Sequence, residues 1–195
     1  MSASRRFSHA IAEGDGISVV AAVADADAAR AAEAQRAEAL VVDGDPTHLR
    51  DATRLPILWR ANATVDRAAE IADAVTLTLP DEDDDHGPIQ RRHENALAVG
   101  LDCAVEVRSE EELERALEML DPEIFLLVPP QDDEEERLEA VLELLAAVPA
   151  GKLAIADLAV TTEHEVHELE RAGVDAVIVH AADVSPLAGE APPEV

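Results

Sequence analysis

Eight short apolar runs recur along the chain, and this repetition limits the possible folds more than any other feature. The runs are rich in β-branched residues, and the segments between them are rich in alanine, glutamate and leucine, as in helices. Alternating strands and helices of this kind form parallel βαβ units. The strands are expected at residues 17–23, 39–42, 56–59, 74–79, 104–107, 124–128, 153–156 and 176–179.

The length of the repeat indicates how these units close. With 195 residues, each βα repeat has about 24 residues, which suits a compact α/β fold, a parallel (β/α)8 TIM barrel with short loops. A doubly wound open sheet is the alternative, because the number of strands does not prove closure. Residues 24–27 lack the glycine-rich loop of a dinucleotide fold. We expect one domain, 1–195, with an N-terminal arm (1–16), a barrel core (17–180) and a tail (181–195).

Helix starts are marked by polar side chains. Thr64 is expected to cap the helix that runs to about Ile71. The segment from Ser109 to Glu112 has the pattern of a capping box. Thr162 begins a helix that ends at Ala172 and Gly173.

The charge is extremely acidic, with 43 acidic and 15 basic residues and a net charge of −28. Such a field repels nucleic acids and anionic membranes, so neither is an expected partner. Lys152 is the only lysine, and aromatic residues make up 2%. We interpret this composition as that of a halophilic protein, because salt screens its self-repulsion; an acidic protein of ordinary salt conditions is the alternative.

The single cysteine, Cys103, excludes an intramolecular disulfide and fits a reducing compartment. No apolar segment follows Arg5 and Arg6 as in a secretion signal, and no apolar run approaches 18 residues. We therefore expect a cytoplasmic protein. The sequence sets no oligomeric state.

Two segments resemble indole-3-glycerol phosphate synthase. Residues 100–117, GLDCAVEVRSEEELERAL, are similar to strand five of that family and its following helix. Residues 170–179, ERAGVDAVIV, are similar to helix seven and strand eight, in a pattern shared by several phosphate-binding barrels. The order and spacing fit from about Phe7 to Ala182, with the extra N-terminal helix of the family shortened or absent. The resemblance implies a barrel and a carbon-carbon lyase of tryptophan biosynthesis.

Carried over residue by residue, the resemblance implies that most catalytic side chains of the family are replaced. The strand-one glutamate and lysine fall on Ala22 and Ala24, and the strand-three lysine, the general acid, falls on Arg60. A guanidinium keeps the charge but remains protonated. The strand-five glutamate is matched by Glu106, and the strand-six asparagine falls near Pro129.

The phosphate-binding turns of the family are also replaced. Its strand-seven Glu-Ser-Gly falls on Asp157, Leu158 and Ala159, and its strand-eight Gly-Ser turn falls on His180 and Ala181. Glycine allows backbone N–H groups to approach a phosphate closely, so its loss weakens such a site.

The candidate site lies at the carboxyl ends of the strands, where barrel sites are found. The catalytic candidates are Glu106, Arg60 and Asp157, and the substrate-binding candidates are Arg108, His180, Asn62 and Asp43. A small phosphate or carboxylate could bind to the cations there. Alternatively, the cations neutralise the acids, with Glu106 paired to Arg60 or Arg108.

No cofactor or metal is expected. The acidic residues at 43–45 and 81–86 lack calcium-loop spacing, and His164 and His167 share a helix face without a zinc motif; in each case a solvated surface is the simpler interpretation. Cys103 is expected to pack in the core. Three functions stay open: a barrel with little or no synthase activity, a working synthase or related phosphosugar lyase that uses Glu106, Arg60 and Asp157, and an assembly partner of tryptophan-pathway enzymes.

Overall fold

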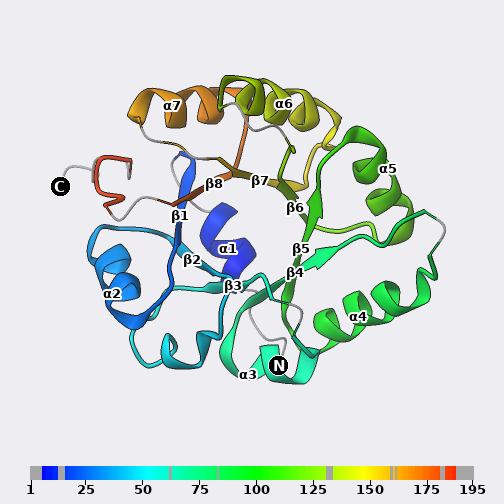
Figure 1. Cartoon of the computed structure of the whole chain (residues 1–195), viewed down its shortest axis with the longest axis horizontal. Coiled ribbons are helices and arrows are strands. Elements are labelled where there is room, and N and C mark those ends of the chain that lie inside the picture. The colour runs from blue at the N-terminus through cyan, green and yellow to red at the C-terminus, as the bar shows by residue number, and fades with distance from the viewer. Residues whose placement is uncertain are drawn as a thin grey trace.

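A closed barrel of eight parallel strands forms the centre of the molecule (Figure 1). The computed structural model describes residues 6–12, 16–61, 63–82, 84–130, 134–158, 160, 162–180 and 183–187. Each strand pairs with the next, and β1 pairs with β8 in register, from Ser18 beside Ala176 to Ala21 beside Val179. This last pairing closes the sheet, so the barrel is confirmed and the open sheet is excluded.

The strands match the expected runs within two residues at each end. They are β1 (Ser18–Ala22), β2 (Ala39–Val42), β3 (Ile57–Trp59), β4 (Ala74–Thr78), β5 (Asp102–Val107), β6 (Ile124–Leu127), β7 (Leu153–Asp157) and β8 (Ala176–Val179). The helices are α1 (Arg6–Ala12), α2 (Ala26–Ala34), α3 (Val65–Ile71), α4 (Gly87–Ala98), α5 (Glu110–Met119), α6 (Glu134–Ala147) and α7 (Glu163–Ala172), with a 3-10 turn η1 (Pro46–His48) after β2.

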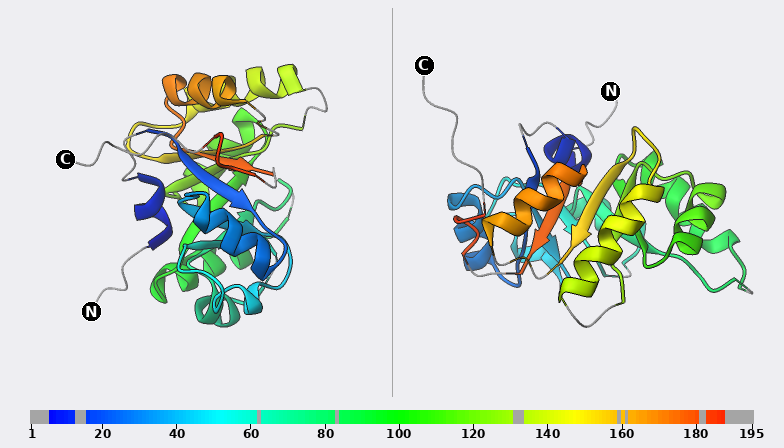
Figure 2. Two further views of the ribbon diagram at one scale, coloured as in Figure 1. Left: turned by 90° about the vertical axis from the view of Figure 1, so that its left-hand side faces the viewer. Right: turned by 90° about the horizontal axis from the view of Figure 1, so that it is seen from above.

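The helix α1 closes the amino-terminal end of the barrel. Three strands, β2, β4 and β8, begin with an alanine that faces inward, and these small side chains leave space at that end. Phe7 and Ile11 of α1 fill it and are almost completely buried. The backbone N–H of Ser8 donates to the Asp102 carboxylate at 2.8 Å. Figures 1 and 2 show α1 over the barrel axis, at the end opposite to the strand tips.

Helix capping differs from expectation in one place. Thr64 caps α3 and Thr162 forms a reciprocal capping box with Glu165 at the start of α7, while Gly173 ends α7 at a φ of 98°. Ser109 caps α5 by accepting from the N–H of Glu112, but the expected box is incomplete. The Glu112 carboxylate accepts instead from the N–H of Arg108, one residue before the N-cap, at 2.8 Å.

Side chains alternate between two cores, as the strand period requires. One core lies between the barrel and its helices. The other lies inside the barrel, with Val20, Ala39, Val41, Leu58, Ala74, Ala104, Ile124, Leu126, Ile155, Ala176 and Ile178. No helix in the described part of the chain is both long and apolar enough to cross a membrane.

Candidate functional site

The alternation of side chains places the charged candidates together at the barrel mouth. Five of them, Asp43, Arg60, Glu106, Asp157 and His180, each lie two residues after a side chain of the inner core. Because strand side chains alternate with a period of two, all five continue the inward-facing rows. Their strands run in parallel, so the rows end at one rim of the barrel.

Arg60 forms the centre of this cluster. Its Nη1 donates to Asp157 Oδ2 at 2.6 Å. Its Nε lies 3.7 Å from Asp43 Oδ1, and its Nη2 lies 4.0 Å from Glu106 Oε2. The side chains of Arg60, Glu106 and Asp157 are only 17%, 12% and 10% exposed. One cation therefore contacts three carboxylates, two of them largely buried.

Glu106 has a second cation on its other side. Arg108 Nη2 donates to Glu106 Oε1 at 2.6 Å. The Arg108 side chain is about half exposed, and its backbone is held by Glu112. Glu106 therefore lies between two guanidinium groups, which is the ion-pair arrangement expected as the simpler alternative.

Asp157 and His180 form a hydrogen-bonded pair across β7 and β8, with His180 Nε2 2.7 Å from Asp157 Oδ1. This bond raises the pKa of His180 above its ordinary 6.5, against the opposing effect of partial burial. Burial favours a higher pKa for Asp157, but the bond to His180 and the charge of Arg60 outweigh it and hold the pKa below the ordinary 3.8. Asp157 is therefore ionised at neutral pH.

These two shifts define a pH window for the pair. Because the pKa of His180 is raised in the folded protein, protonated His180 contributes fully to stability below pH 6.5. This contribution is lost as the pH rises through the pKa of His180 in the folded state. The lowered pKa of Asp157 means that its contribution is present above 3.8 and is lost as the pH falls through the folded-state value. The interaction is thus strongest in mildly acidic solution.

Six of the seven candidate residues meet at the mouth, and the seventh, Asn62, lies outside the described residues. Asp43 is at the rim, with a side chain that is 79% exposed. Trp59 stabilises the loop that carries Asp43, because the indole Nε1 of Trp59 donates to the Gly44 carbonyl at 2.7 Å.

Sequence reasoning missed two threonines of β4. Thr76 follows inward-facing Ala74 by two residues and is 6% exposed, and its hydroxyl has no hydrogen-bond partner among the described residues. Thr78 pairs in register with Glu106 at the rim. The strand period of two could have identified them, because Thr76 and Thr78 lie two and four residues after inward-facing Ala74. These hydroxyls add polar groups beside the charged cluster.

The described residues contain no group of three or more histidine, cysteine or acidic side chains arranged for a metal. His164 and His167 are exposed, and they lie 3.6 Å from Glu168 and 3.2 Å from Glu170. Asp45 caps η1 by accepting from the N–H of Thr47 at 3.0 Å. Cys103 is buried, as expected.

The fold and the position of this cluster define the class of protein: a TIM barrel with a polar mouth at the carboxyl ends of its strands. Comparison with known proteins narrows the class. The chain is 36% identical over 113 residues to indole-3-glycerol phosphate synthase of Variovorax paradoxus (strain S110), covering 57% of this chain and 41% of that protein. It is 30% identical over 142 residues to the enzyme of the same name from Geobacillus sp. (strain WCH70), covering 67% and 52%.

The chain is therefore related to the indole-3-glycerol phosphate synthase family, and the expected resemblance to that family is confirmed. It spans about half the length of the curated relatives it matches. No protein-family model matches it.

Proposed function

We propose that this chain is a barrel related to indole-3-glycerol phosphate synthase with little or no synthase activity, whose mouth binds small phosphate or carboxylate anions weakly. The observation that carries the proposal is the pairing of Arg60 with three carboxylates at 2.6, 3.7 and 4.0 Å. A guanidinium held in this way is already neutralised. An anion can reach it only by displacing a carboxylate of the protein itself.

The proton-transfer chemistry of the family also lacks suitable groups here. Arg60, at the position that matches the general acid, carries a guanidinium, which is a poor proton donor. Asp157 has a lowered pKa and donates no proton near neutrality. The positions that match the strand-one glutamate and lysine are Ala22 and Ala24. Losing one group that stabilises a developing charge costs roughly 100- to 1000-fold in rate, and several losses together leave little turnover.

Anion binding rests on the cations nearest to solvent. The side chains of Arg108 and His180 are each about half exposed, whereas the Arg60 side chain is only 17% exposed. Six charged residues line the mouth. When His180 is protonated, three of them are positive and three are negative (Arg60, Arg108 and His180; Asp43, Glu106 and Asp157). A phosphate or carboxylate can exchange with Glu106 or Asp157 at these cations, which favours weak binding over the tight binding of a preformed anion site.

A single-turnover assay tests the proposal. The family substrate, an anthranilate-linked deoxyribulose phosphate, is mixed with excess protein in molar KCl, and indoleglycerol phosphate is measured for the wild type, Glu106→Gln and Arg60→Ala. We expect no product from any of the three, with circular dichroism establishing that each is folded. Product from the wild type that disappears in both variants would instead establish a working synthase, with Glu106 as base and Arg60 binding the substrate carboxylate.

A further inference from the structure

The charged side chains of the mouth form a chain of alternating sign. Arg108 lies 2.6 Å from one oxygen of Glu106, and Arg60 lies 4.0 Å from the other oxygen of the same carboxylate. Asp157 lies 2.6 Å from Arg60 and 2.7 Å from His180. Both ends of the chain are therefore basic side chains, and both are about half exposed. They differ because an imidazole gains and loses its charge near neutral pH, whereas a guanidinium does not.

The two ring nitrogens of His180 have different surroundings. Nε2 lies 2.7 Å from Asp157 Oδ1. Because the pKa of Asp157 is lowered, its carboxylate is ionised at neutral pH and only accepts hydrogen bonds. Nε2 therefore carries the proton of neutral His180, and Nδ1 keeps a lone pair. No described residue forms a hydrogen bond with Nδ1.

The neighbouring strand adds no charge beside this histidine. Ala22 and His180 each follow the last register pair of β1 and β8, so they are neighbours at the rim, and Ala22 presents only a methyl group. Among the described residues, the charged groups that act on His180 are Asp157 after the core of β7, Arg60 after β3 and Asp43 after β2. Asp157 is already bonded to Nε2, and Asp43 is exposed at the rim.

We propose that protonation of His180 creates a binding site for an oxyanion, a phosphate or sulfate group, at Nδ1. This inference rests on the proposed binding of small anions at the mouth. The lone pair of Nδ1 repels an anion while His180 is neutral. Protonation converts the same atom into a charged N–H donor, while Nε2 keeps its bond to Asp157. The anion then binds at Nδ1 without displacing a carboxylate of the protein, and its affinity rises as the pH falls.

The surroundings of His180 favour this protonation near neutral pH. The hydrogen bond to Asp157 raises the pKa of His180 above 6.5, with a further contribution from the charge of Asp43 and an opposing one from Arg60. The net charge of −28 opposes anion binding at long range. In molar salt the Debye length is about 3 Å, so the groups in direct contact with the anion decide its affinity.

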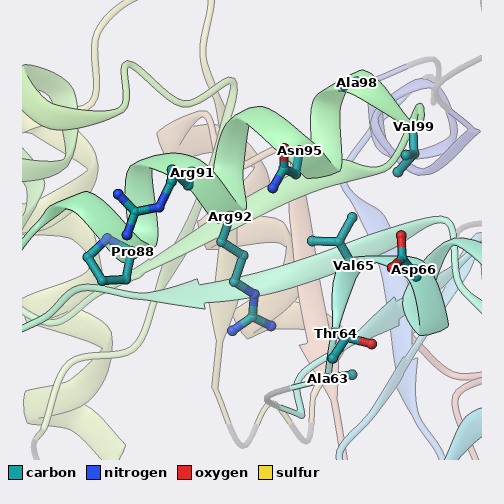
Figure 3. Close-up of a pocket in the computed structure, with 10 residues that line it drawn as sticks. All are labelled: Ala63, Thr64, Val65, Asp66, Pro88, Arg91, Arg92, Asn95, Ala98 and Val99. Atoms are coloured by element: carbon teal, nitrogen blue, oxygen red, sulfur yellow. The ribbon is translucent and has the colours of Figure 1, made fainter.

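A groove between α3 and α4 is a poorer site for such an anion (Figure 3). It has a volume of about 700 Å³, and its lining includes Arg91 and Arg92 of α4 and Asp66 of α3. An acid also lies beside Arg91, because Arg91 Nη1 and Asp85 Oδ1 are 3.0 and 3.1 Å from the position that a Cβ would take at Gly87. Arg91→Ala is therefore a suitable control for anion binding outside the mouth.

Binding of sulfate tests the proposal, because sulfate keeps its two charges throughout the range in which histidine titrates. It is added to the full chain in molar KCl, and amide NMR signals give the dissociation constant. We expect this constant to increase at least about tenfold between about pH 5.5 and about pH 9, as His180 loses its proton. Sulfate should also raise the pKa of His180 further, because the coupling between two bound ligands is reciprocal.

Two substitutions separate the charge of His180 from its other contacts. His180→Gln keeps a donor for Asp157 but cannot gain a proton, so its dissociation constant should equal the alkaline value of the wild type at every pH. His180→Arg keeps its charge, so its affinity should stay within about threefold of the acidic wild type at alkaline pH. Arg91→Ala and His164→Gln, on an exposed part of α7, should behave as the wild type. Circular dichroism establishes that each variant is folded.

The outcomes separate this inference from the proposed function. A wild-type dissociation constant that is the same at both pH values would overturn the inference and leave the proposed anion binding intact. A pH dependence that persists in His180→Gln would do the same. No binding of sulfate to the folded protein at any pH would overturn the inference together with the proposed anion binding.

Discussion

Replacing Asp157 with alanine is expected to lower the free energy of unfolding by about 3 kcal/mol, because it removes the closest partner of a largely buried cation. Asp157 accepts from Arg60 at 2.6 Å and lies 2.7 Å from His180. Removing one member of a buried ion pair generally costs about 3–5 kcal/mol. We expect the lower end of that range, since Glu106 and Asp43 still lie near the guanidinium. Urea unfolding at pH 6 in molar KCl measures the change.

Asp43→Ala is the control for this experiment. It removes one negative charge from the same arginine, but Asp43 is 79% exposed and lies 3.7 Å away. An exposed pair of this kind contributes about 0–1 kcal/mol, so the control should be close to wild type. Equal and small effects of the two substitutions would show that the buried pairing around Arg60 contributes nothing to stability, contrary to our description of the mouth.

Phe7→Ala is expected to cost about 3–5 kcal/mol, the usual range for truncating a fully buried aromatic side chain in a core. Phe7 is completely buried inside the amino-terminal end of the barrel, against inward-facing side chains that include several alanines. Those small residues cannot expand to fill the space, so the cavity persists. Thermal and urea unfolding measure the loss.

Phe7→Leu is the control for this experiment. It keeps a large apolar side chain on α1 and so tests whether the loss of stability in Phe7→Ala comes from the lost side-chain volume. A leucine keeps most of the apolar contacts, so the cost should stay below about 1.5 kcal/mol. An alanine variant as stable as wild type would mean that α1 does not close the barrel in solution. Such a result would contradict the fold described here at that end.

The barrel itself could be predicted because its signal is repeated eight times. Each strand has its own apolar run, and the runs at 39–42 and 176–179 coincide with β2 and β8 to the residue. An error at one strand end, such as the start of β5 at Asp102 instead of residue 104, leaves the topology unchanged. Closure depends on the pairing of β1 with β8, which no local pattern contains.

The sequence left open whether an N-terminal helix is shortened or absent, and the residues of α1 explain why. It has seven residues with only Phe7 and Ile11 as large apolar side chains, too few turns for a helical period to be recognised. Its stability comes from packing inside the barrel, and the buried carboxylate that accepts from Ser8 lies 94 residues away in sequence. Contacts of such long range are not readable from a single chain segment.

The members of the mouth cluster could be predicted, as could the pairing of Glu106 with Arg60 or Arg108, but the carboxylate closest to Arg60 could not. Strand ends identify Arg60, Glu106, Asp157 and His180 because sites of this fold lie there. Arg60 and Asp157 are 97 residues apart, and several carboxylates compete for the same cation. Only the geometry of the closed barrel decides that Asp157 is the nearest one. This pairing, in which Asp157 and Glu106 neutralise Arg60, is the basis of our functional account.

The most direct test of that account is an NMR titration of His180 in the wild type and in Asp157→Asn. We predict that the pKa of His180 lies above 6.5 in the wild type and falls toward 6.5 in the variant, because the hydrogen bond to an ionised Asp157 is the main cause of the shift. A pKa of His180 at or below 6.5, or one that is the same in both proteins, would contradict the central claim that the cations of the mouth are held by its own carboxylates.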